Sequence, residues 1–241
     1  MNEFRALIFD CDGVLAETEA DGHRVAFNMV FEEEKLRINW DVETYGELLR
    51  IAGGKERMRL YFNKIKLQKD ISNIDEYIKK LHKRKTAIYM EMIEQGLIQG
   101  RKGVKRLAVE AHRHGLKLAI CSTSNERGVT LLAKHVFGHK IFKYIDYILA
   151  GDVVSRKKPD PAIYLLAAKK LGVKPEECCV IEDTENGVQA AKATGMTCIV
   201  TRSQYTKTEV FPSADIVVDS LGEGEETVTI EGIQAIFNRN K

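Results

Sequence analysis

The sequence predicts an α/β fold: a parallel sheet with helices on both faces, plus an all-helical domain inserted after the first strand. Short and nearly continuous apolar runs are typical of strands that are buried on both faces of a parallel sheet. After Gly100 these runs alternate with helical patterns, as expected for a layered α/β domain. Before Gly100 the strand signals disappear and apolar residues recur at helical spacing, which indicates the inserted domain.

The first strand is predicted over residues 4–9, and it ends at Asp10-Cys11-Asp12-Gly13. Burial should stop at Asp10, because an unpaired buried charge costs several kcal/mol. Asp10 and Asp12 can project toward one site, and Gly13 lets the backbone turn sharply. Two close carboxylates repel unless a cation lies between them, and hard oxygen ligands suit Mg²⁺. Taken alone, the pair could also be solvated acids at a strand end.

The inserted domain is predicted over residues 17–95 and should contain four or five amphipathic helices. Its apolar positions recur over residues 26–31, 48–51, 58–65, 74–81 and 88–93. A Gly53-Gly54 break ends one helical pattern and opens another. The α/β domain is predicted to comprise residues 1–16 and 96–241.

Beyond Gly100 the predicted strands and helices alternate. Strands are expected at 118–121, 145–150, 178–181, 197–201 and 216–218, and helices at 104–115, 129–137, 161–171, 187–193 and 229–238. Pro161 stands near the start of one helix and Gly172 just past its end, which is the expected asymmetry. No internal repeat interrupts this order.

The charge balance argues against several kinds of partner. There are 37 Lys and Arg residues against 35 Asp and Glu, a net charge of +2, which gives no electrostatic case for nucleic acid. The basic stretch at 79–85 is most simply a solvated helix face. No apolar run approaches the length of a membrane span. We therefore expect no nucleic-acid, membrane or obligate protein partner, and a monomer or weak dimer.

The cysteines predict a reducing compartment, such as the cytoplasm. There are five, an odd number, and they lie in or beside apolar runs without any C-x-x-C spacing. Buried reduced thiols explain this pattern better than disulfides or zinc. The first strand begins so early that we expect no signal peptide before it.

Polar residues follow four of the predicted strands, at the edge where ligands bind in open parallel sheets. The clusters are Asp10 and Asp12; Ser122, Thr123 and Ser124; Lys158; and Glu182 with Asp183. The hydroxyl-rich cluster leads into a helix N-terminus, a natural cradle for phosphate. Each cluster alone is a common loop. Four of them at one edge of a sheet predict an active site.

These segments carry a family resemblance. Asp10-x-Asp12-Gly13-Val14-Leu15, then Ser122, Lys158 and Glu182-Asp183, in this order, resemble the four motifs of the haloacid dehalogenase-like (HAD) phosphohydrolases, whose core is Rossmann-like. The helical insertion is similar to the cap of the phosphoglucomutase and phosphoglycolate phosphatase branch, so the resemblance covers essentially the whole chain. Segments 15–19, 23–28, 53–57 and 151–152 are closer still to the CbbY-like sugar-phosphate phosphatases. Departures are an extra residue between Glu19 and His23, and Cys11 where many relatives have an aliphatic residue.

The resemblance implies a mechanism. Asp10 would attack phosphorus and form an aspartyl-phosphate. Mg²⁺ would be held by the side chains of Asp10 and Asp183 and by the backbone carbonyl of Asp12. Glu182 would be a further ligand or a partner of the ligands. Lys158 and Ser122 would hold the phosphate oxygens, and Asp12 would act as general acid and base.

The cap would choose the substrate and exclude water. By resemblance, the residues expected to contact the sugar phosphate are Glu17, His23, Lys55, Arg57 and Lys85 on or beside the cap, with Thr123 and Ser124 in the core, and Tyr45 and Arg50 as weaker candidates. Lys55 and Arg57 follow a Gly-Gly turn and could grip a second phosphate. Xylulose 1,5-bisphosphate, the substrate of one phosphatase in this branch, is therefore one candidate.

Other functions remain open at this point. A β-phosphoglucomutase would isomerise a sugar phosphate on the same scaffold, and a phosphonatase would need a Schiff-base lysine, for which Lys55 is the only plausible candidate. A dehalogenase is disfavoured because Asp12, Glu182 and Asp183 would have no role without a metal. A non-catalytic binding module should have lost one of the motif residues, and none is missing.

Overall fold

The protein is described from a computed structural model, which covers residues 3–51, 53–67, 71–222 and 227–239. The chain divides into two compact units, Met1–Glu17 with Ile98–Lys241 and Thr18–Leu97. The sequence predicted the boundaries after residues 16 and 95. We call the first the core unit and the second the helical unit, and describe each by itself.

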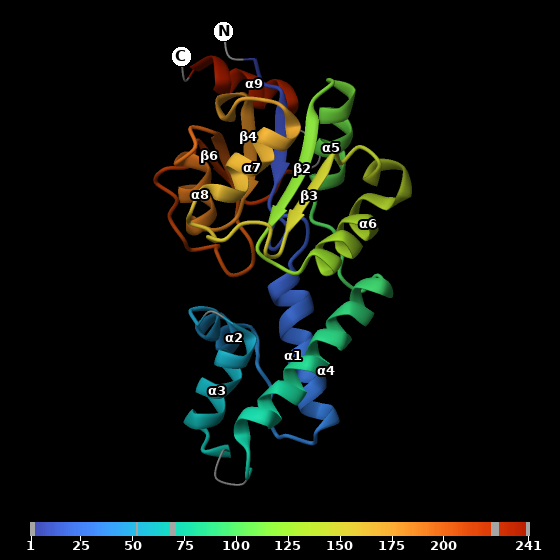
Figure 1. The fold of residues 1–241 in the computed structure, drawn as a ribbon, viewed down its shortest axis with the longest axis vertical. Coiled ribbons are helices and arrows are strands. Elements are labelled where there is room, and N and C mark those ends of the chain that lie inside the picture. Colours follow the sequence, from blue (N-terminus) through green and yellow to red (C-terminus); the bar gives the residue numbers. More distant parts are fainter. Residues whose placement is uncertain (1–2, 52, 68–70, 223–226, 240–241) are drawn as a thin grey trace. The chain divides into compact units, whose positions relative to one another are not determined.

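The core unit contains a parallel sheet (Figure 1). The strands are β1 (Ala6–Phe9), β2 (Lys117–Ser122), β3 (Tyr147–Ala150), β4 (Cys178–Glu182), β5 (Thr197–Thr201) and β6 (Ile216–Val218). Their order is β3-β2-β1-β4-β5-β6, and each neighbouring pair is parallel. The chain order reverses beside β1, which makes the carboxyl end of β1 the point where ligands bind in such sheets. The predicted α/β class is confirmed.

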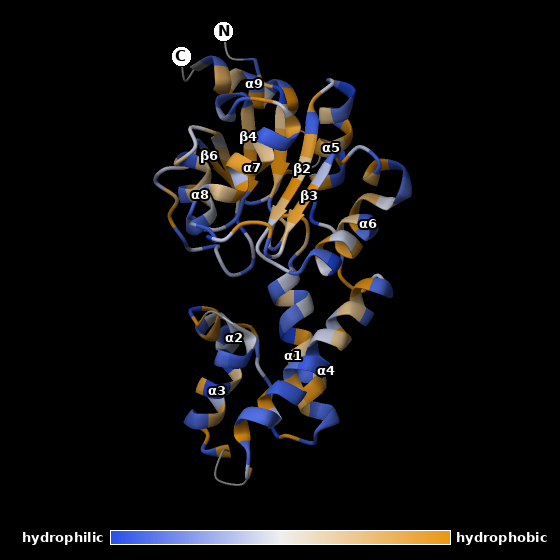
Figure 2. Ribbon diagram, in the orientation of Figure 1, coloured by the Kyte–Doolittle hydropathy of each residue, from blue (hydrophilic) through white to orange (hydrophobic). Residues whose placement is uncertain are grey.

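The strand register brings the polar clusters to one edge. Phe9 pairs with Ile120 on β2 and with Ile181 on β4, so the residues after these three leave the sheet together. The strands are strongly apolar because both faces of the sheet are covered. Figure 2 shows this as mostly orange, hydrophobic residues along β2, β3 and β4. All four residues of β1 are buried.

Helices cover the two faces of the sheet. They are α5 (Val104–Arg113), α6 (Glu126–Phe142), α7 (Ala162–Leu171), α8 (Glu185–Lys192) and α9 (Ile230–Arg239), with a 3₁₀ turn, η3 (Pro175–Glu177). Alternate strand residues such as Ala6 and Ile8 share a core cluster with α7 and α8. On the other face Phe9 contacts Phe137 of α6, with ring centroids 6.2 Å apart. Gly138 kinks α6 at φ 71°, just after the predicted end of that helix.

The helical unit contains a short π-helix, η1 (Thr18–His23), and the helices α1 (Arg24–Glu33), α2 (Val42–Leu49), α3 (Gly54–Lys64) and α4 (Ile74–Glu94). Side chains cap two of them: Asp41 accepts from Thr44 N at 2.7 Å, and Asn73 accepts from Glu76 N at 3.2 Å. Their apolar faces meet around Trp40, which is fully buried among aromatic rings. None of the described helices is long and apolar enough to cross a membrane.

Candidate active site

The candidate site lies at the edge of the core unit where the carboxyl ends of β1, β2 and β4 meet. Lys158, on the loop between β3 and α7, turns its ammonium group inward. Its Nζ lies 2.6 Å from Asp10 Oδ1 and 2.6 Å from Glu182 Oε1. Asp10 is 8% exposed and Glu182 is fully buried. The structure therefore brings three of the predicted residues together as one cation between two carboxylates.

Glu182 receives hydrogen bonds on both of its oxygens. The Tyr164 hydroxyl donates to Oε1 at 2.5 Å, while Oε2 accepts from Asp183 N at 3.0 Å and from the backbone and hydroxyl of Thr184 at 3.4 and 3.3 Å. Close packing also confines the carboxyl group: a Cβ at Gly187 would lie 1.9 Å from Glu182 Cδ. Only glycine fits there, at the start of α8.

The buried charges are unequally balanced. Burial raises the pKa of Asp10 to about 8, with Lys158 opposing and Glu182 adding to the shift. Burial would also raise the pKa of Glu182, but Lys158 holds it below its usual value. Burial alone would lower the pKa of Lys158, and the two carboxylates reverse that shift. Lys158 lies equally close to both carboxylates, at 2.6 Å, so one positive charge faces two buried carboxyl groups.

Asp183 completes a group of carboxylates that fits a divalent cation. Its Oδ1 is buried and has no hydrogen-bond partner in the described part of the chain. Burial, then Glu182 and Asp10, raise the pKa of Asp183 well above its usual range. One oxygen from each of Asp10, Glu182 and Asp183 lies within 4.8 Å of the others. An orphaned buried carboxylate oxygen beside two further carboxylates is the environment that Mg²⁺ would stabilise.

Asp12 is held by the hydroxyl-rich segment after β2. Ser124 Oγ donates to Asp12 Oδ2 at 2.6 Å, and Ser122 Oγ donates to the same oxygen at 3.2 Å. The Ser124 backbone N–H in turn donates to Ser122 Oγ at 3.0 Å. Thr123, between them, is exposed. Asn125 then caps α6, so this segment ends at a helix N-terminus, which favours anions.

Arg101 anchors the turn after β1 from a distant part of the chain. It donates to the carbonyl oxygens of Gly13 and Arg202, and at 3.2 Å to that of Thr201. Gly13 has φ 78°, and a Cβ there would lie 1.9 Å from Asp183 Oδ2. Holding Gly13 in place therefore also fixes the space next to Asp183.

Glu17 was predicted to contact the substrate, and in this structure it has other partners. Its Oε1 lies 3.2 Å from Arg101 Nε, and its Oε2 accepts from Gln204 N at 3.0 Å. Both partners belong to the core unit, as does Glu17. Glu17 therefore fastens the segment that leads toward the helical unit to the loop after β5.

Buried Lys85 and half-buried His23 form a pair inside the helical unit. Lys85 Nζ lies 2.8 Å from His23 Nδ1 and 4.7 Å from the centroid of the Phe27 ring, and Lys85 is only 6% exposed. The stretch 79–85 is therefore a solvated face only in part. The His23 ring packs against Tyr89 in a tilted arrangement, with ring centroids 3.9 Å apart. Burial, then Lys85 and Arg57, lower the pKa of His23 well below 6.5.

The remaining candidates of the helical unit differ in their surroundings. Arg57 donates to Ile51 O at 2.9 Å and to the Tyr45 hydroxyl at 3.1 Å, so much of its guanidinium is engaged within the unit. Lys55 and Arg50 are exposed. Lys55 lies close enough to His82 to lower the pKa of that histidine, after burial and Lys85.

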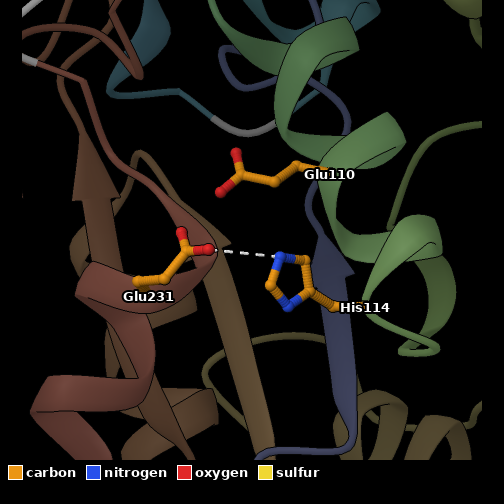
Figure 3. Close-up of side chains that lie close together, drawn as sticks. All are labelled: Glu110, His114 and Glu231. Atoms are coloured by element: carbon orange, nitrogen blue, oxygen red, sulfur yellow. Dashed lines mark ion pairs between the residues drawn. The ribbon is translucent and has the colours of Figure 1, made fainter.

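A second group of potential metal ligands, Glu110, His114 and Glu231, lies between α5 and α9 (Figure 3). Here Glu110 Oε1 accepts from Ile230 N and Oε2 from Arg106 Nη1, both at 2.7 Å. His114 Nε2 lies 3.2 Å from Glu231 Oε1. Because both oxygens of Glu110 already accept hydrogen bonds, this group is explained by the attachment of α9 to α5.

Sequence reasoning missed Tyr164 and Arg101. Tyr164 lies in the first turn of α7 among apolar residues, so its place in the sequence indicated only that it would be part of the buried core. Arg101 directly follows Gly100, and no local pattern marks it. The available signal was chemical: a tyrosine needs a partner for its hydroxyl when it is buried, and so does a guanidinium.

Comparisons with known proteins agree with this arrangement. Residues 4–195 match the family described as haloacid dehalogenase-like hydrolase. The chain is 52% identical to a CBBY-like protein of Arabidopsis thaliana, over 92% of this chain and 70% of that protein. It is 41% identical to the protein CbbY of Cereibacter sphaeroides, over 90% and 93%. Its fold matches a crystal structure of mutant CbbY from Rhodobacter sphaeroides in complex with xylulose-(1,5)bisphosphate, with TM-score 0.77 and 37% identity, over 95% and 98% of the two chains. The chain therefore belongs to the haloacid dehalogenase-like hydrolases, in the CbbY-like branch.

Proposed function

We propose that this protein is a Mg²⁺-dependent phosphatase that hydrolyses a small sugar phosphate through an aspartyl-phosphate on Asp10. The observation that carries the proposal is the buried Asp10 carboxylate, with Lys158 Nζ at 2.6 Å and an orphaned Asp183 oxygen in the same carboxylate group. These groups at one sheet edge suit nucleophilic attack, phosphate binding and cation binding, which supports the proposal.

The proposed reaction has two steps. An Asp10 oxygen forms a bond to phosphorus while the bond from phosphorus to the sugar oxygen breaks, and Asp12 donates its proton to that leaving oxygen. A water molecule then attacks the phosphorus of the aspartyl-phosphate and gives its proton to Asp12. The second step releases inorganic phosphate and restores the Asp10 carboxylate.

Several groups would stabilise the phosphoryl group. Lys158 and Ser122 would hold its outer oxygens as charge redistributes, together with backbone N–H groups of the segment after β2. Asp10 and Asp183, with the backbone carbonyl of Asp12, would hold Mg²⁺. The bound cation would offset the repulsion between the Asp10 carboxylate and an anionic substrate.

We further propose that the helical unit selects the substrate. Its cationic candidates are Lys55, Arg57 and Lys85, with His23 beside Lys85 at 2.8 Å. Several cations suit a substrate that carries a second phosphate. The related CbbY that was crystallised with xylulose-(1,5)bisphosphate supports a sugar bisphosphate, and xylulose 1,5-bisphosphate is the first compound to test.

A panel of sugar mono- and bisphosphates, incubated with Mg²⁺ and followed by phosphorus NMR, tests the proposal. We expect inorganic phosphate to be released fastest from a sugar bisphosphate. An isomerised sugar phosphate without free phosphate would instead identify a mutase. If no phosphate ester is converted at all, the proposed function is wrong.

A further inference from the structure

Glu182 is distinguished from the other carboxylates of the site by the number of its donors. Lys158 and Tyr164 donate to Oε1 at 2.6 and 2.5 Å, and Asp183 N and Thr184 donate to Oε2. Thr184 donates from both its backbone N–H and its hydroxyl, so Glu182 has five donors. An ionised carboxylate offers about four lone-pair sites, and these donors therefore occupy all of them. In contrast, Asp183 Oδ1 has no donor among the described residues.

Tyr164 is placed to control this difference. It is fully buried, so its hydroxyl cannot turn to solvent, and a phenol is protonated at neutral pH. The hydroxyl therefore remains a donor at neutral pH. The ring also lies close to the lysine, with Lys158 Nζ 4.8 Å from its centroid. One side chain thus touches both members of the Lys158–Glu182 pair.

We infer that Tyr164 is a positioning residue: its hydroxyl keeps Glu182 turned toward Lys158, so that Glu182 orients the lysine and leaves Mg²⁺ to Asp10 and Asp183. This inference rests on the proposed function. The sequence left open whether Glu182 is a direct Mg²⁺ ligand or a supporting partner, and the inference assigns it the supporting role. Without the hydroxyl, Oε1 loses a donor and becomes available to the cation, while the lysine loses its fixed partner.

The test compares Tyr164→Phe with the wild-type protein. Calorimetric titration with MgCl₂ alone should show tighter Mg²⁺ binding in the variant, because a carboxylate oxygen has been released. Turnover of p-nitrophenyl phosphate should show a lower kcat, by roughly tenfold, with KM little changed, because Lys158 is less well placed. General loosening of the site would instead weaken Mg²⁺ binding, so the direction of the shift separates the two explanations.

The matched control is Tyr77→Phe, which removes the same atom from another tyrosine–glutamate pair. Tyr77 lies on α4 and donates to Glu34 Oε2 at 3.4 Å. We expect it to change neither Mg²⁺ affinity nor kcat. Unchanged or weaker Mg²⁺ binding in Tyr164→Phe would overturn the inference.

A second measurement needs no variant. In a crystal structure of the wild-type protein with Mg²⁺, we expect no Glu182 oxygen at the direct coordination distance of about 2.1 Å. A Glu182–Mg²⁺ bond of that length would also overturn the inference. Failure of the proposed function would be seen differently, as wild-type protein that binds Mg²⁺ and hydrolyses no phosphate ester.

Discussion

Ser124 donates a hydrogen bond to Asp12 Oδ2 at 2.6 Å, and this bond joins the segment after β2 to the turn after β1. Asp12 is the proposed proton donor to the leaving group, so its orientation decides the rate of that transfer. Ser122 donates to the same oxygen at the longer distance of 3.2 Å. The shorter bond is therefore the stronger constraint on Asp12.

Ser124→Ala should lower kcat by about tenfold, less than the roughly hundredfold or greater loss expected for Asp12→Asn, because general acid catalysis itself contributes that much. Ser124→Thr keeps a hydroxyl and should recover most of the rate. Steady-state kinetics with a sugar phosphate measures both. A rise in KM with unchanged kcat would mean that Ser124 contacts the substrate and does not orient Asp12.

Asp10→Asn should abolish turnover, because an amide oxygen is a poor nucleophile and the aspartyl-phosphate cannot form. Rapid acid quenching of wild-type protein with labelled substrate should trap labelled protein, and the variant should trap none. Lys158 retains Glu182 as a partner in the variant, which limits damage to the fold. Persistent turnover by folded Asp10→Asn would contradict covalent catalysis at this residue.

Removal of Mg²⁺ should stop turnover and lower stability together. A chelator should abolish hydrolysis, and added Mg²⁺ should restore it. Binding at a hundred times the dissociation constant should stabilise the fold by about 2.7 kcal/mol, seen as a rise in Tm. Asp183→Asn should lose most of this rise. Glu231→Gln alters the second carboxylate group and serves as the control, since its response to Mg²⁺ should equal that of the wild type.

His23 makes the helical unit sensitive to acid. Burial and Lys85 lower its pKa well below 6.5, so the unfolded chain binds more protons than the folded one when the pH falls below 6.5. Stability is therefore full above that pH and decreases as the pH falls toward the folded pKa. Below pH 6.5, His23→Gln should reduce the dependence of the free energy of unfolding on pH by up to about 1.4 kcal/mol per pH unit. Urea unfolding at several pH values measures it, and equal slopes would contradict the prediction. His82 shifts in the same direction and stays in both proteins.

Arg101→Met should destabilise the core unit by about 2 to 4 kcal/mol, because buried carbonyl groups lose their donor and Glu17 loses its charge partner. Urea unfolding followed by far-ultraviolet circular dichroism measures the loss. Arg37→Met, at an exposed position, is the matched control and should change stability little. Equal stabilities of the two variants would contradict the anchoring role of Arg101.

The parts of the fold that follow from local patterns could be predicted from the sequence. Each described strand was expected, because a strand buried on both faces leaves a continuous apolar run such as Ala6–Phe9. The convergence of Asp10, Lys158 and Glu182 followed from topology, since parallel strands end at one edge. The sequence predicted that α6 ends at Phe137, because the next residue, Gly138, usually ends a helix. In the structure Gly138 only kinks α6, which continues to Phe142.

Contacts between distant side chains could not be predicted in this way. Lys85 belongs to a strongly basic stretch, and only the packing of α4 against η1 and α1 decides that it is buried beside His23. Glu17 stays a predicted substrate contact, and no pattern around it predicted its partners Arg101 and Gln204. No periodicity encodes such pairs, because they depend on how loops from separate strands meet.

The base of the inserted segment is closed by backbone hydrogen bonds. Ala16 and Gly100 form an antiparallel bridge, and Arg101 N donates to Leu15 O at 2.9 Å. The chain thus leaves and re-enters the α/β layer through two adjacent crossings, as a hairpin loop does. Under the proposed function, residues 18–97 are therefore the exchangeable module whose replacement would change the substrate, while Glu17 and Arg101 stay with the core unit.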